Sequence, residues 1–225
     1  MASVLTVPII MFVTDRSVLE PAAHDTDESC KRLLELVDAW VHAGVNIVHI
    51  REATLPDRQL VDLVRQARSL ASGTNARIVV NDRPDIALAA GADGVHLKDD
   101  EISVSRVRAL GPPTWFVGRS VHDLDGAERA VGGGGVDYLL AGAIHETPAK
   151  RGHATLGFTG LQGIANAVTV PVVAIGGLRF GEARAVADAG AAGLAGIRMF
   201  CNGEKGSSKE RSASISSTHR AFDRV

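Results

Sequence analysis

One junction, in which a glycine ends a helix and a short apolar run follows, recurs along the chain. It reads AGVNIVHI from Ala43, AGADGVHL from Ala90 and AGAAGLAGI from Ala189, with GGVDYLLAG from Gly134 as a looser copy. Glycine ends helices in a left-handed backbone conformation that other residues tolerate poorly, and continuous apolarity over a short length is typical of a strand buried on both faces. The repeat therefore predicts several helix-to-strand units of one kind.

The apolar runs are predicted as strands. We expect them at Val7–Val13, Asn46–Ile50, Arg77–Val80, Gly94–Leu97, Trp115–Val117, Val136–Ala141, Val170–Ala174 and Gly193–Ile197. Helical periodicity lies between them, and in Cys30–His42 and Asp57–Leu70 the apolar residues fall on one stripe. Short strands that alternate with helices predict a parallel sheet.

About eight such units predict an α/β fold, a single (β/α)8 TIM barrel, because right-handed crossovers can close the sheet on itself. An open doubly wound sheet is the alternative, which the lack of G-x-G-x-x-G after the first strand disfavours. We expect the barrel over residues 1–200 and a polar C-terminal tail over 201–225. The tail contains NGEKGSSKERSASISSTHR, so we expect a degenerate last helix or disorder rather than a second domain.

The composition excludes several classes of partner. The formal net charge is −2, and no basic run is interleaved with aromatic residues as a nucleic-acid surface requires. No apolar stretch is long enough for a membrane helix. The two cysteines, Cys30 and Cys201, form neither a metal motif nor a disulfide framework. We expect a cytoplasmic protein that binds a small molecule, with neither nucleic acid nor membrane as partner, and we leave a homo-oligomer open.

Functional side chains follow nearly every predicted strand. The carboxyl ends of parallel barrel strands open onto one face, where active sites form. The eight ends carry Thr14 and Asp15; His49, Arg51 and Glu52; Asn81, Asp82 and Arg83; His96 and Lys98 with an acidic run at Asp99, Asp100 and Glu101; Arg119, Ser120 and His122; His145, Thr147 and Lys150; Gly176 and Gly177; and Ile197 and Arg198. This collection predicts a site for a polar, anionic small molecule.

Some of these residues have a structural and a functional interpretation. His49 and Arg51 are two residues apart and so point to one face of a strand. Asp82 precedes Arg83 and Pro84, where it can cap the next helix, or it can join the acidic run as an oxygen ligand for Mg²⁺. Gly176 and Gly177 form a tight turn or let backbone N–H groups approach a phosphate.

Six motifs in order carry a resemblance to a known family. They are HIRE, NDRPDIALAAGADGVHL, GRSVH, GAIHETPAKRG, PVVAIGG and AGAAGLAGI, from about Met11 to Phe200. The chain resembles the family that joins thiamine phosphate synthase with TenI, and in particular the TenI-like branch, the thiazole tautomerases. The resemblance implies a (β/α)8 barrel that binds a thiazole phosphate and, in the synthase branch, an aminopyrimidine diphosphate with Mg²⁺.

The chain departs from the synthase pattern at the second strand. Synthases normally carry Q-L-R-E-K there, whose Arg and Lys hold the diphosphate, whereas this chain reads HIREA. The resemblance therefore gives Arg51 the diphosphate role, while His49 replaces Gln and Ala53 replaces Lys.

Other synthase positions keep their residues. The Asn-Asp pair after the third strand, the Ser after the fifth strand, and one Thr and the Lys of the sixth-strand loop G-P-I-F-P-T-x-T-K correspond to Asn81, Asp82, Ser120, Thr147 and Lys150. The second Thr of that loop is Ala149. The second metal carboxylate falls at or near Glu101.

TenI proteins are more similar to this chain in HIRE, GRSVH and the E-T of the sixth loop. Their catalytic His falls at Ala143, and His145 lies two residues on, hence on the same strand face. Arg198 stands where a Ser normally helps to bind phosphate, and a guanidinium can bind that oxyanion through two hydrogen bonds.

The first hypothesis is a TenI-like thiazole tautomerase that needs no cofactor. His145 would take and return the proton, since an imidazole titrates near neutrality, and His122 would act as a relay. The catalytic set is completed by Ser120 and Arg51. The substrate- and phosphate-binding set is His49, Asn81, Thr147, Lys150, Gly176, Gly177, Ile197 and Arg198, of which Gly176, Gly177, Arg198 and Thr147 would surround the phosphate.

The second hypothesis is a thiamine-phosphate synthase that joins an aminopyrimidine diphosphate to a thiazole phosphate. Arg51, Lys150 and Mg²⁺ held by Asp82 and Glu101 would stabilise the departing diphosphate. The third is a non-catalytic barrel that binds a phosphate ligand and regulates a partner, which the departures from the family pattern leave open.

Overall fold

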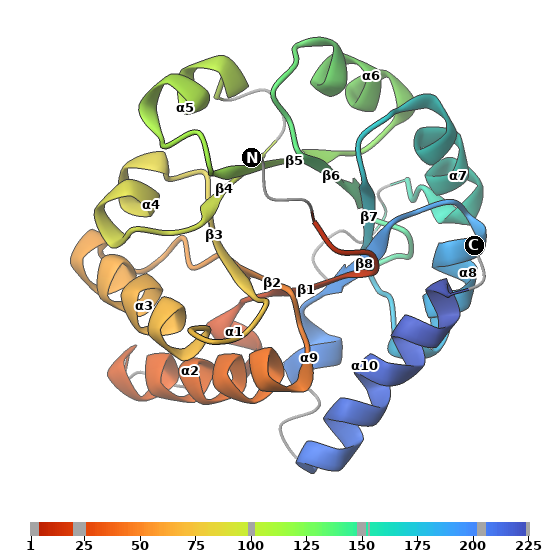
Figure 1. Cartoon of the computed structure of the whole chain (residues 1–225). Coiled ribbons are helices and arrows are strands. Elements are labelled where there is room, and N and C mark those ends of the chain that lie inside the picture. Colours follow the sequence, from red (N-terminus) through yellow and green to blue (C-terminus); the bar gives the residue numbers. More distant parts are fainter. Residues whose placement is uncertain are drawn as a thin grey trace.

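The predicted strands close into one barrel. The computed structural model describes residues 5–19, 26–98, 102–147, 152, 154–201 and 206–223. The strands are β1 Ile9–Val13, β2 Ile47–Ile50, β3 Arg77–Asn81, β4 Gly94–Leu97, β5 Phe116–Val121, β6 Tyr138–Gly142, β7 Val172–Ile175 and β8 Gly193–Gly196. Each strand pairs in parallel with the next, and β8 pairs with β1, so the (β/α)8 barrel is confirmed and the open sheet is wrong (Figure 1).

Helices surround the barrel on the outside (Figure 1). They are α1 Arg16–Leu19, α2 Thr26–Ala43, α3 Asp57–Leu70, α4 Pro84–Ala90, α5 Val104–Leu110, α6 Leu124–Gly132, α7 Gly157–Ala167, the 3₁₀ helix η2 Phe180–Glu182, α8 Ala183–Asp188, α9 Arg198–Cys201 and α10 Ser208–Phe222. The predicted helix Asp57–Leu70 has the bounds of α3, and Cys30–His42 lies within α2. None of the described helices combines the length and apolarity that crossing a membrane requires.

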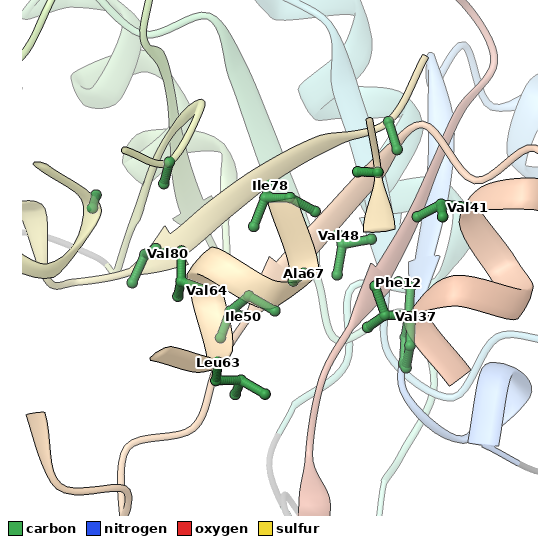
Figure 2. Packing of buried hydrophobic residues seen from close by; sticks show 14 of the residues in the cluster. Phe12, Val37, Val41, Val48, Ile50, Leu63, Val64, Ala67, Ile78 and Val80 are labelled. Atoms are coloured by element: carbon green, nitrogen blue, oxygen red, sulfur yellow. The ribbon is translucent and has the colours of Figure 1, made fainter. Parts of the chain in front are cut away.

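Each strand is buried on both faces. In β1, Ile9, Met11 and Val13 pack inside the barrel, whereas Ile10 and Phe12 face the surrounding helices. Figure 2 shows this outer layer, in which side chains of β1, β2 and β3 pack against α2 and α3. Burial of alternate residues on opposite sides produces the continuous apolar runs seen in the sequence.

The junction glycines have the backbone conformation that the repeat predicts. Gly44, Gly91 and Gly190 have φ angles of 115°, 69° and 79°. In this left-handed region a Cβ is strained, so glycine allows the chain to turn sharply from each helix toward the next strand.

The fifth strand is longer than predicted. The apolar run suggested Trp115–Val117, but β5 covers Phe116–Val121 because Arg119 and Ser120 continue the strand. A strand predicted from apolar residues alone ends where two successive polar residues begin. In the structure Arg119 is buried and donates to the carbonyl of Ile102, while Ser120 bonds within the barrel.

The C-terminal segment holds a helix where the sequence suggested a degenerate helix or disorder. Ser207 and Glu210 cap α10 reciprocally, as the Ser207 Oγ accepts from the Glu210 N–H at 3.3 Å and the Glu210 carboxylate accepts from the Ser207 N–H at 2.6 Å. Ile215, Thr218 and Phe222 are buried, and α10 packs on α2 and α8. Because so few positions of α10 are buried, its sequence shows little of the apolar periodicity that is typical of a helix packed on a core.

Candidate active site

The ends of β2 to β5 direct four polar side chains into the barrel. Ile47 packs inside, so His49, two residues further along β2, faces the same way. The same alternation directs Asn81 on β3, His96 on β4 and Ser120 on β5 inward. His49 and His96 are 2% and 1% exposed, and their ring centroids lie 4.5 Å apart. The barrel interior below the mouth is therefore polar on this side.

His49 and Asn81 form a directed hydrogen-bond series that ends on Asp82. The Asn81 Nδ2 donates to Asp82 Oδ2 at 2.9 Å, which leaves Asn81 Oδ1 to accept from His49 Nε2 at 3.1 Å. The imidazole thus carries its proton on Nε2, and its buried Nδ1 has no hydrogen-bond partner in the described part of the chain. Burial lowers the pKa of His49 to about 3, with the Arg51 charge acting in the same direction, so the ring is neutral near pH 7.

Asp82 is held at the mouth and does not cap the following helix. The residue that caps α4 is Arg83, which makes no side-chain cap bond and instead pairs with Asp57 and Asp85. Asp82 has a φ of 51°, and its Oδ1 accepts from the Lys98 N–H at 2.6 Å while Oδ2 lies 3.3 Å from Lys98 Nζ. A non-glycine residue in this left-handed region is uncommon and often marks a functional site.

The described residues fit a Mg²⁺ ion that arrives with a diphosphate. Within them no group of three or more His, Cys, Asp or Glu residues forms a metal cage. Magnesium, however, is commonly bound through one or two carboxylates together with substrate phosphates. Asp82 supplies one oriented carboxylate, and its side chain is 14% exposed. The expected second ligand, Glu101, lies outside the described residues.

Ser120 is hydrogen-bonded to His96 rather than to another predicted site residue. The His96 Nε2 and Ser120 Oγ are 2.9 Å apart, and the His96 Nδ1 lies 3.1 Å from the Tyr138 hydroxyl. Burial lowers the pKa of His96 well below its usual value and raises the pKa of Tyr138. Both rings are therefore neutral at physiological pH.

Arg51 lies just beyond β2 and presents its guanidinium at the mouth. Its backbone N–H donates to Thr14 Oγ1 at 3.0 Å, and its Nη2 donates to Asp15 Oδ2 at 3.1 Å. The side chain is 42% exposed. A ligand with phosphate oxygens can therefore reach this cation, and the diphosphate role that the family resemblance implies for Arg51 stays a prediction.

The segment after β6 places His145 against a carboxylate. The His145 Nε2 lies 2.7 Å from Glu182 Oε1, and the other Glu182 oxygen accepts from the Arg179 N–H at 2.9 Å. Both His145 and Ala143 lie beyond the end of β6 at Gly142. His122 instead places its Nδ1 2.6 Å from the Gly142 carbonyl, and no hydrogen bond between His122 and His145 is found in the described residues.

The paired glycines after β7 are needed for close packing. Gly176 and Gly177 have φ angles of 111° and 70°. A Cβ on Gly176 would lie 2.6 Å from Ala143 Cα, and one on Gly177 would lie 2.8 Å from His145 Cβ. The Gly176 carbonyl also accepts from the His145 N–H at 2.9 Å. The pair therefore brings the β6 and β7 loops together, whether or not its N–H groups also bind phosphate.

The structure describes three of the remaining predicted binding residues. Thr147 ends a described segment and is half-buried, as is Ile197 after β8. Arg198 opens α9 and is exposed. Lys150, like Glu101, lies outside the described residues. Among the predicted residues, hydrogen bonds therefore join His49, Asn81 and Asp82, and close packing joins Gly177 to His145.

Two site residues escaped the sequence analysis. Glu182 comes thirty-seven positions after His145 in a different loop, and Tyr138 opens β6, which reads simply as an apolar strand. Tyr138 is the only tyrosine of the chain. It lies two residues before Leu140, so the two side chains point to the same face of β6, which is the barrel interior. The sequence offered no other indication of this position.

Replacing His49 with Gln is expected to reduce the loss of stability in acid. The unfolded imidazole takes up a proton near its usual pKa, but the folded one does so only near pH 3, so the unfolded state binds more protons between these values. This residue therefore lowers the free energy of unfolding by up to about 1.4 kcal/mol per pH unit as the pH falls. Urea titrations between about pH 7 and pH 4.5 measure the difference.

The matched control is His42→Gln, since the His42 side chain is 60% exposed on α2. We expect this variant to keep the wild-type pH dependence. A His49→Gln protein that loses stability as steeply as the wild type would show that His49 is not buried in its neutral form.

The chain is similar to known proteins over most of its length. Residues 21–200 match the family model TMP-TENI, described as thiamine monophosphate synthase. The thiamine-phosphate synthase of Albidiferax ferrireducens is 40% identical over 182 residues, which cover 78% of this chain and 82% of that protein. That of Gloeobacter violaceus is 36% identical over 172 residues, 76% of this chain and 50% of that protein. The solved thiamine phosphate pyrophosphorylase from Pyrococcus furiosus has a TM-score of 0.80 and 29% identity over 96% of this chain and 97% of that chain.

Proposed function

We propose, because the chain belongs to the thiamine monophosphate synthase (TMP-TENI) family, that it joins an aminopyrimidine diphosphate to a thiazole phosphate to form thiamine phosphate. The relatives that it matches favour this activity over the tautomerase that the TenI-like motifs suggested. The structural observation that carries the proposal is Asp82, a carboxylate held at the barrel mouth by Asn81 and Lys98.

The proposed reaction is a substitution in which the thiazole nitrogen replaces the diphosphate. The thiazole nitrogen forms a C–N bond to the methylene carbon of the aminopyrimidine, and the C–O bond to the diphosphate breaks. Negative charge grows on the departing diphosphate, so cations already in place at the mouth stabilise the transition state. Arg51 and Lys98 are two such cations among the described residues, and Lys150 is expected to be a third.

Lys98 also bears on the missing synthase lysine at Ala53. Its ammonium lies 3.3 Å from Asp82 Oδ2 and its side chain is 59% exposed, so it can contact a diphosphate bound beside Asp82. When bound, Mg²⁺ would neutralise part of the diphosphate charge, and Asp82 would hold it. The chain thus retains positive charge near the leaving group despite the substitution at Ala53.

The test is incubation with both substrates, with and without Mg²⁺, followed by identification of the products. Thiamine phosphate that forms only with Mg²⁺ supports the proposal, and no product from an intact protein with both substrates contradicts it. Conversion of one thiazole isomer to another without condensation would indicate the tautomerase. Binding of the thiazole phosphate without any product would indicate the non-catalytic barrel.

One observation favours the tautomerase as a second candidate. His145 and Glu182 form an imidazole–carboxylate pair at 2.7 Å, and the two side chains are 39% and 31% exposed. A carboxylate can orient an imidazole and balance the charge that it acquires with a proton, which suits proton transfer on a thiazole ring. The pair lies on the catalytic face, within the loops after β6 and β7.

His145→Ala separates the two candidates. We expect thiamine phosphate formation to fall by no more than about threefold, because departure of diphosphate requires cations rather than this imidazole. Any tautomerisation of a thiazole carboxylate phosphate should fall by about 10²-fold or more, the usual contribution of a general acid–base group. Product analysis on both substrates measures the two rates. Loss of condensation together with tautomerisation would contradict this assignment of His145.

A further inference from the structure

A row of three residues crosses the barrel interior from β6 to β4. Parallel register places His96 opposite Gly118, and Gly118 opposite Tyr138. A Cβ on Gly118 would lie 2.1 Å from Tyr138 Cζ, so the absent side chain on β5 is what lets the phenol cross this strand. The phenol then reaches His96 Nδ1 at 3.1 Å. Ser120, two residues beyond Gly118 on β5, lies one step nearer the mouth.

The donor and the acceptor in each of these hydrogen bonds can be assigned from the hydrogens that Tyr138 and a neutral His96 carry. Tyr138 is fully buried, and His96 Nδ1 is the partner that its hydroxyl has within the described chain. A buried hydroxyl hydrogen needs an acceptor, so Tyr138 donates to His96 Nδ1. The neutral imidazole then carries its hydrogen on Nε2, which donates to Ser120 Oγ at 2.9 Å.

This arrangement leaves the hydrogen of Ser120 unused. Its oxygen already accepts from His96, and no other hydrogen bond of the Ser120 side chain is found in the described residues. Ser120 is half-buried at the carboxyl end of β5, where the barrel opens. The hydroxyl accepts from His96 below it, so its hydrogen can point toward an acceptor at the mouth. Burial keeps both His96 and Tyr138 uncharged, so the order of donors does not reverse by ionisation near neutral pH.

We propose that Tyr138 and His96 are positioning residues that orient Ser120 as a hydrogen-bond donor to an acceptor atom of the bound substrate. The proposal rests on the proposed function only for the identity of that substrate. Its structural content is a fixed donor order: Tyr138 to His96, His96 to Ser120, and Ser120 to the ligand. Because a preoriented donor strengthens as charge develops on its acceptor, the effect should appear mainly in kcat.

The first experiment reads the tautomer without turnover. Nitrogen-15 NMR of the full-length protein at neutral pH should show a protonated Nε2 and an acceptor-type Nδ1 for His96, whose signals are assigned by their loss in His96→Gln. In Tyr138→Phe the preference for this tautomer should weaken. A wild-type His96 with its proton on Nδ1 would overturn the donor order, even if the protein proves to be an active synthase.

The second experiment is a double-mutant cycle on thiamine phosphate formation. We expect Tyr138→Phe to lower kcat about tenfold in the wild-type background but less than twofold in the Ser120→Ala background, because the tyrosine acts through the serine. Equal losses in both backgrounds would overturn the proposal, since a general structural effect is additive.

A third experiment compares two substitutions of His96. His96→Gln retains one acceptor and one donor in a neutral side chain, so we expect it to keep kcat within about threefold of the wild type. His96→Leu removes both groups and should lose as much activity as Ser120→Ala. Equal activity of the Gln and Leu variants, with equal melting temperatures, would show that the hydrogen bonds of His96 have no part in the reaction.

Discussion

Asp82→Asn is expected to lower the kcat for thiamine phosphate formation by at least about 10²-fold at saturating Mg²⁺. The amide keeps the size of the side chain, and Asn tolerates the left-handed backbone that Asp82 adopts at a φ of 51°. It removes the negative charge that would hold Mg²⁺ beside the departing diphosphate. The amide nitrogen cannot accept from Asn81 and Lys98 as the Asp82 oxygen does, so we expect a melting temperature a few degrees below that of the wild type. The kcat is therefore compared at a temperature at which thermal unfolding shows both proteins to be folded.

The matched control is Asp62→Asn on the outer face of α3. Asp62 is 54% exposed and its ion pair with Arg65 is long, at 3.7 Å, so neutralising it changes little in stability or activity. We expect this variant to keep kcat within about twofold. Should Asp82→Asn retain more than about a third of the wild-type kcat, the carboxylate would have no part in metal-assisted departure, and the synthase proposal would lose its structural basis.

The barrel could be predicted because each strand is buried on two sides. Alternate residues of β1 face the barrel interior and the helices, which leaves no polar residue to interrupt the apolar run. Where polar groups enter a strand this signal fails. Arg119 and Ser120 hid the second half of β5, since the burial of an arginine and the internal hydrogen bond of a serine depend on neighbours distant in sequence.

The face that carries the site could be predicted, but the partners of its residues could not. The position of His49 and Asn81 at strand ends follows from the apolar runs alone. That Asn81 would bridge His49 to Asp82 depends on the parallel register of β2 with β3, which a single sequence does not reveal. The same is true of Glu182, which meets His145 only because the β6 and β7 loops pack closely.

Gly94→Ala is expected to destabilise the protein by at least about 3 kcal/mol. Gly94 opens β4 directly opposite Phe116 of β5, and a Cβ at this position would lie 2.0 Å from the Phe116 carbonyl oxygen. Backbone cannot rotate away as a flexible side chain can, and in a closed barrel one strand cannot withdraw without disturbing both neighbours. Thermal unfolding should show a decrease in melting temperature of roughly 6–12 °C for a chain of this size.

The control is Gly163→Ala, which we expect to raise the stability of the protein rather than lower it. Gly163 lies within α7, and nothing approaches within 4 Å of the position its Cβ would take. Alanine there should stabilise the protein by up to about 1 kcal/mol, because glycine is the poorer helix former. A Gly94→Ala protein as stable as the wild type would mean that β4 and β5 are spaced more widely than their register implies. His96 and Ser120 lie on these two strands, so their hydrogen bond, and with it the orientation of Ser120, depends on the spacing that Gly94 permits.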